Sequence, residues 1–133
     1  MIRVALILCL LVTTAAAAVV MPRMLDATRA IENWQGRDGQ FGERGAYGIR
    51  PATWKQHMGA LPFTLARQEY WGRECARRHI EWLKTQLPAA GIDPNEFNLA
   101  LAYNAGLDAV LRSAAPVRAY QHATRVRNLY QAK

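Results

Sequence analysis

The chain has 133 residues, the size of one small domain, and 17 Lys and Arg residues against 10 Asp and Glu residues give it a formal net charge of +7. No run of basic residues is longer than two and no recognition-helix pattern is present, so nucleic acid is not an expected partner.

The N-terminus has the features of a secretory signal peptide. Arg3 supplies a positive charge, residues 4–12 are apolar, and small residues suited to cleavage lie near Ala17 and Ala18. The apolar run to Met21 approaches the length of a membrane span, so the alternative is an uncleaved anchor that reaches to residue 22. We therefore expect a signal peptide at 1–18 and one domain at 23–133, in the periplasm or outside the cell. There a basic protein meets an anionic cell envelope.

The cysteines and histidines predict neither a disulfide nor a metal site. Only Cys75 remains once the signal is removed, and its place in an apolar-spaced helix indicates a core residue. His57, His79 and His122 are far apart in the sequence and show no metal-ligand spacing. We expect no metal and no cofactor, and a monomer that its apolar core stabilises.

Helical periodicity outside residues 35–50 predicts a mainly α domain. Glycine recurs at every third position from Gly36 to Gly45 between polar residues, which predicts a glycine-rich loop or a small irregular hairpin. A loop this long in a small domain is typically functional. The expected helices lie after Pro22, from Pro51, over about 64–87 with Gly72 as a candidate break, after Asn95 as N-cap, over 108–111, and from Pro116 onward.

Glu32 is the residue on which a functional interpretation depends. It follows Ile31 and so lies one position away from the apolar face of its helix. The plain interpretation is an acid at the helix surface. The functional interpretation is a carboxyl where a helix meets a cleft, partly desolvated, so that it stays protonated and acts as a general acid.

Three separated segments share the motifs of one family. Glu32 is followed 13 residues later by GAYGI and then PATW, LALAYNAG lies on a later buried helix, and RAYQHATRVRNLY closes the chain. This order resembles the lysozyme-like superfamily, and most closely the soluble lytic transglycosylases of bacteria. The resemblance extends over residues 27–130.

The resemblance implies a lysozyme-like helical domain in which the loop flanks an active-site cleft. It implies cleavage of the β-1,4 bond between N-acetylmuramic acid and N-acetylglucosamine in peptidoglycan strands, with Glu32 as acid/base. Tyr103 and Asn104 match cleft residues beside the catalytic Glu. Tyr47, Ile49 and Trp54 would wall the cleft from the other side, with Trp54 stacking on a sugar. The alternative for Tyr103 and Trp54 is a place in the core.

Two positions depart from the family pattern: Asn33 replaces the usual Ser, and Gly48 replaces the usual Gln. If Arg50 replaced that Gln beside Glu32, it would favour the ionised carboxylate, so Gly48 bears on activity rather than on fold. This leaves a catalytically weak or inactive domain that binds wall glycan or an envelope partner as the alternative, followed by an unrelated exported helical protein.

The number of carboxylates separates two reactions. Hydrolysis would need a second carboxylate, for which Asp38 and Glu43 are the candidates. The resemblance implies a single-Glu reaction, in which the substrate's acetamido group assists and a 1,6-anhydro sugar forms.

Overall fold

The computed structural model describes residues 17–32 and 37–132, so the predicted signal at 1–18 and Asn33 lie almost wholly outside the described residues. Within these ranges the chain is mainly α-helical, as the sequence predicts, and has no extended strand. In the same ranges, no helix has both the length and the apolar character needed to cross a membrane. The elements are α1 (Met21–Glu32), α2 (Pro51–Met58), the 3-10 helix η1 (Phe63–Arg67), α3 (Glu69–Ala89), α4 (Glu96–Ala105), α5 (Leu107–Leu111) and α6 (Val117–Gln131).

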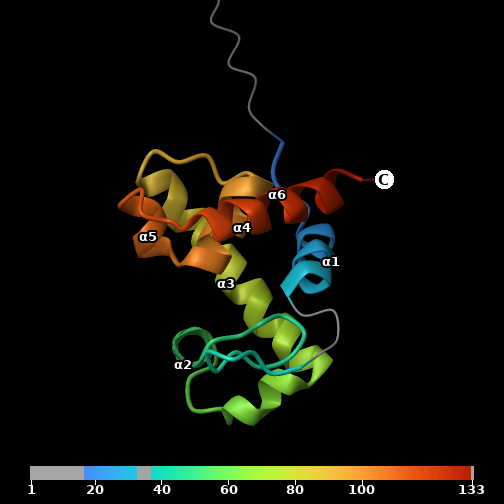
Figure 1. Ribbon diagram of the computed structural model, residues 1–133. Coiled ribbons are helices and arrows are strands. Elements are labelled where there is room, and N and C mark those ends of the chain that lie inside the picture. Colours follow the sequence, from blue (N-terminus) through green and yellow to red (C-terminus); the bar gives the residue numbers. More distant parts are fainter. Residues whose placement is uncertain (1–16, 33–36, 133) are drawn as a thin grey trace, which may run out of the picture.

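Helix α3 connects two groups of elements (Figure 1). Helices α1, α4, α5 and α6 gather around one end of α3, and we call them the helical lobe. The segment 37–50, α2 and η1 gather around its other end, and we call them the loop lobe. The most extensive helix contact joins α4 to α6, followed by that between α1 and α6. Glu32, at the end of α1, therefore belongs to the helical lobe.

The core follows one face of α3. Five of its side chains are completely buried at helical spacing: Cys75, Ala76, Ile80, Leu83 and Leu87. The candidate break at Gly72 is not a break, since α3 runs through it without interruption. A Cβ atom on Gly72 would lie 2.9 Å from the carbonyl oxygen of Ala66, so this glycine lets α3 approach η1 closely. Burial also raises the pKa of Cys75 to about 12, which agrees with a core thiol rather than a nucleophile.

The predicted starts of α2, α4 and α6 are confirmed, whereas the helix expected from about residue 64 begins only at Glu69, after η1. Pro51 occupies the first turn of α2, and Pro116 directly precedes α6. Asn95 caps α4, because its side-chain oxygen accepts a hydrogen bond from the amide of Asn98 at 2.8 Å. These local signals fix where the helices that carry the later site residues begin.

Segment 37–50 is an irregular loop with one antiparallel bridge. Arg44 and Ile49 exchange backbone hydrogen bonds of 2.9 and 3.1 Å. The turn between them has Gly45 and Gly48 at φ +74° and +58°, a conformation that glycine adopts without strain. The turn thus brings Gly48 back toward the helical lobe and places Tyr47 in the core.

Candidate active site

The carboxyl of Glu32 lies between the last helix and the Gly45–Gly48 turn. Its side chain is only 14% exposed, and its Oε1 atom lies 3.1 Å from Nε2 of His122 in α6. Its Oε2 atom fills the space beside Gly48, where an added Cβ atom would lie 2.9 Å from it. Any side chain at position 48 would therefore have to displace the carboxyl. Gly48 allows the loop lobe to touch the acid directly.

His122 is a site residue that the sequence interpretation missed. Its side chain is buried at 8% exposure, and its Nε2 atom has no partner at hydrogen-bond geometry among the described residues, despite the short distance to Glu32. The available signal was its spacing. His122 shares one face of α6 with Val126, which is buried, and Tyr130, which is partly buried. A polar residue on a buried helical face points to a specific contact.

Arg50 does not take the place of the missing glutamine. Its Nη2 atom donates a 2.9 Å hydrogen bond to the carbonyl oxygen of Asn104, and within the described chain it forms no ion pair with Glu32. The charged or ionisable side chain beside the Glu32 carboxyl is therefore that of His122 and not that of Arg50. The same bond joins the start of α2 to the end of α4 across the two lobes.

Tyr103 links the lobes beside Glu32. Its hydroxyl donates a 2.6 Å hydrogen bond to the carbonyl oxygen of Tyr47. Burial raises the pKa of Tyr103 well above its ordinary value, and the negative charge of Glu32 adds to the effect. The hydroxyl therefore remains a neutral donor that holds the turn in place.

Tyr47 and Trp54, which the resemblance placed along the cleft wall, lie in the core at 1% and 2% exposure. The Tyr47 hydroxyl donates to Glu69 at 2.8 Å and accepts from Arg73 at 2.9 Å, which fixes the turn to α3. The indole nitrogen of Trp54 donates to the carbonyl oxygen of Leu61 at 2.7 Å. Neither ring presents a face to a sugar in this structure. Tyr47 and Trp54 therefore support the site from the core.

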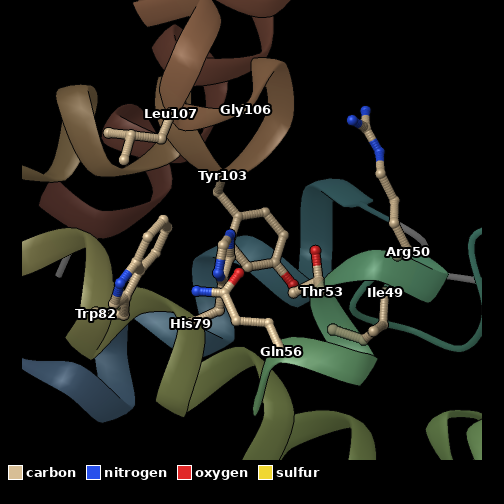
Figure 2. Close-up of a pocket in the computed structure, with 10 residues that line it drawn as sticks. Ile49, Arg50, Thr53, Gln56, His79, Trp82, Tyr103, Gly106 and Leu107 are labelled. Carbon is tan, nitrogen blue, oxygen red and sulfur yellow. The ribbon is translucent and has the colours of Figure 1, made fainter. Parts of the chain in front are cut away.

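Two adjoining pockets meet at Gly48. The acid pocket contains Glu32 and is otherwise lined by Gly39, Gln40, Phe41, Glu43 and Gly48. The aromatic pocket, shown in Figure 2, shares Gly48 with the acid pocket and lies between the lobes. Its lining residues are Gly48, Ile49, Arg50, Thr53, Gln56, His79, Trp82, Tyr103, Gly106 and Leu107.

His79, which lines the aromatic pocket, belongs to a histidine pair that the sequence spacing did not reveal. Nε2 of His57 and Nδ1 of His79 lie 2.9 Å apart. The His79 ring stacks on Trp82 at a centroid distance of 5.6 Å, and it meets Tyr103 edge-on at 5.5 Å. Burial, with His57 and Arg50 nearby, lowers the pKa of His79 to about 4. The ring is therefore neutral near pH 7.

The two candidate second carboxylates differ in position. Asp38 pairs with Arg67 at 2.7 Å, a hydrogen bond that lowers the pKa of Asp38, and it does not line the acid pocket. Glu43 does line it, and its Oε2 atom accepts a 3.0 Å bond from the amide of Phe41. Only Glu43 thus shares a pocket with Glu32. In the part of the chain that the structure describes, no three His, Cys, Asp or Glu residues are grouped to hold a metal ion.

Compared with known protein families, characterised proteins and solved structures, the chain has no match. Its geometry brings together the three sequence segments singled out above: Glu32 meets the turn at Gly48, Tyr103 bonds to Tyr47, and the last helix contributes His122. A shielded carboxyl in a pocket, next to an imidazole and a second pocket with aromatic walls, is suited to proton transfer on a bound ligand.

Proposed function

We propose that this protein cleaves the β-1,4 bond between N-acetylmuramic acid and N-acetylglucosamine in peptidoglycan, as a lytic transglycosylase with a lysozyme-like fold. The observation that carries the proposal is the place of the Glu32 carboxyl. It lies at the end of a helix, 14% exposed, and it lines a pocket between two lobes. A general acid must reach the substrate yet be shielded from bulk water, and this position meets both needs.

The proposed reaction needs one carboxyl group. Glu32 donates its proton to the glycosidic oxygen as the bond to the anomeric carbon breaks, and the substrate's acetamido group stabilises the developing positive charge. The sugar's own 6-hydroxyl then attacks the anomeric carbon, and its proton returns to Glu32. Atoms and charge balance without a water molecule. The pairing of Asp38 with Arg67 removes one candidate second carboxylate and leaves Glu43 as the other.

His122 acts here as a positioning residue. At 3.1 Å from Oε1, the imidazole limits how the Glu32 carboxyl can turn, and Gly48 limits it from the other side. A carboxyl held between two neighbours delivers its proton along one direction, which lowers the entropic part of the barrier. The tight contact is thus part of the proposed chemistry.

The aromatic pocket is proposed as the place of the sugar units next to the cleaved bond. Trp82 and Tyr103 offer apolar surface, whereas Thr53, Gln56 and Arg50 offer hydrogen-bonding groups (Figure 2). A sugar ring has the matching pattern of apolar faces and polar edges. Trp82 takes the stacking role that the sequence interpretation assigned to Trp54.

The alternative function is a catalytically weak or inactive domain that binds wall glycan or an envelope partner. The absence of a polar side chain at Gly48 favours it, because nothing at that position can orient a reacting group. Under either function, the protein acts as an exported monomer, in the periplasm or outside the cell, free or anchored by its N-terminus.

The test is a digest of purified peptidoglycan with the full chain, read by mass spectrometry of the soluble products. Anhydro ends, lighter than reducing ends by the mass of one water molecule, are expected. Reducing ends would instead indicate hydrolysis, with Glu43 as the second carboxylate. Release of no product while the protein still pellets with the wall would favour the binding domain.

Glu32→Gln should lower the cleavage rate by about 10²–10⁴-fold, as expected for loss of a general acid. Glycan binding and the melting temperature should change little, because Gln has nearly the shape of Glu. Glu81→Gln, at an exposed position on α3, is the matched control and should cleave normally. Unchanged cleavage by Glu32→Gln would refute the assignment of the acid.

A further inference from the structure

A third pocket lies beside the acid pocket and has no role in the reaction described so far. We call it the arginine pocket. It shares Phe41 and Glu43 with the acid pocket, so the two adjoin. The complete lining of the arginine pocket is Phe41, Glu43, Arg50, Asn104, Arg118, His122 and Arg125.

The charge of this pocket is predominantly positive. Arg118 and Arg125 lie seven residues apart on α6, so they share one helical face. Neither arginine has an ion-pair partner among the described residues. The third guanidinium, that of Arg50, donates one hydrogen bond to the carbonyl oxygen of Asn104. Glu43 is the one carboxylate of the lining. Three guanidinium groups around one hollow are suited to a carboxylate or phosphate, which arginine binds through paired hydrogen bonds.

His122 connects the arginine pocket to the acid. It lines the arginine pocket, it is more than nine-tenths buried, and its Nε2 atom lacks a hydrogen-bond partner in the described structure. That atom is itself covered by protein atoms and lies 3.1 Å from Oε1 of Glu32, so the arginine pocket adjoins the acid.

We propose that the arginine pocket binds a carboxylate carried by the glycan strand beside the cleaved bond. This inference rests on the proposed function and adds a substrate preference to it. A volume of about 250 Å³, against about 30 Å³ for one water molecule, has room for the carboxylate and part of the chain that bears it. The protein would therefore select strands with acidic substituents over neutral glycans such as chitin.

Two carboxylates of peptidoglycan fit this chemistry, and they can be separated. Strands with intact stem peptides carry the peptide carboxylates, whereas strands stripped of peptide carry the free lactyl carboxylate. Amidation of each kind of strand removes the charge with little change of size. Chitin oligosaccharide provides a backbone that has no carboxylate at all.

The experiment measures cleavage and binding of these substrates by the wild-type chain and by Arg118→Gln/Arg125→Gln. Binding is measured by calorimetry in the Glu32→Gln background, so that no substrate is consumed. The matched control is Lys55→Gln/Arg112→Gln, which removes two charges outside the pocket. The arginine variant should bind carboxylate-bearing strands roughly tenfold more weakly, as loss of charge-assisted hydrogen bonds implies, and amidated strands as the control does.

The outcomes separate the two proposals. Binding of carboxylate strands that depends on Arg118 and Arg125, without cleavage, would support the pocket and refute the enzyme. Cleavage that is indifferent to amidation and to both arginines would refute the pocket and leave the enzyme. If the preference holds for only one kind of strand, that strand identifies the carboxylate that the pocket binds.

Discussion

Two histidine sites flank Gly48, and they differ in what meets the ring. On one side, His79 contacts His57, Trp82 and Tyr103, and its neutral ring completes an aromatic wall. On the other side, His122 meets the carboxyl of Glu32. Both histidines are shielded from water, so burial alone does not make a histidine functional. The difference lies in the neighbour: His79 packs against aromatic rings, whereas His122 lies against an ionisable carboxyl group.

The largest effect that separates the two sites is on stability at low pH. The pKa of His79 is lowered from 6.5 to about 4 in the folded chain, so between these values the unfolded chain binds more protons. Stability should therefore fall as the pH drops from about 6.5 to 4, by at most about 3 kcal/mol from this one residue. His57, with a pKa lowered by burial, acts in the same direction.

His79→Gln isolates this contribution. Its unfolding free energy, measured by urea denaturation between pH 7 and 4, should decline less steeply than that of the wild type. Carboxylates contribute equally to both proteins and cancel in the comparison. Parallel pH profiles for the two proteins would show that His79 is not held neutral by the fold.

The second effect tests the residue that divides the two sites. Gly48→Ala introduces a Cβ atom against the Glu32 carboxyl, and the displaced acid should cleave about 10–100-fold more slowly. Gly59→Ala is a matched control, because its φ of +61° is close to the +58° of Gly48, but a Cβ atom there meets nothing within 4 Å.

Both glycine variants should lose about 1–3 kcal/mol of stability, because residues with a side chain rarely adopt a positive φ. Only the variant at Gly48 should lose cleavage in addition, measured as release of soluble wall fragments. Equal activity in the two proteins would contradict the close packing of Gly48 on the acid.

The smallest effect concerns the histidine beside the acid. His122→Ala should lower kcat by about tenfold with little change in KM, because the acid loses a neighbour that orients it. His122→Gln retains a hydrogen-bonding group at this position and should restore most of the rate. A packing role alone predicts instead that both variants lose stability while kcat stays the same, which thermal melts and initial rates would reveal together.

The helical class and the helix starts could be predicted from the sequence because their causes are local. Proline at a first turn and asparagine at an N-cap act within a few residues. The sequence left Trp54 open between the cleft wall and the core, because the bond of its indole to Leu61 forms across a chain reversal. The His57–His79 contact depends on how α2 packs on α3, and periodicity within either helix does not contain that information.

The candidate site, like the fold, could be predicted from the sequence only in part. Glu32 was singled out from its helix position and from the resemblance, and the structure places its carboxyl against Gly48. The choice between Asp38 and Glu43 required the pairing of Asp38 with Arg67, which a sequence does not display. Likewise, the three arginines of the third pocket come from α6 and from the residue before α2, and only the fold brings them together.

The bond between Val20 and Tyr130 has a consequence for handling the protein. The amide of Val20 donates to the Tyr130 hydroxyl at 2.9 Å, which fixes the start of the described chain beside α6. In Figure 1 this point lies at the end of the helical lobe away from α2, and the C-terminus lies near it. A bead, a surface or a fusion partner attached at either end would therefore lie at the end of the helical lobe away from α2, whereas the aromatic pocket lies between the lobes. Immobilised in this way, the protein would present its pockets to insoluble wall fragments in suspension.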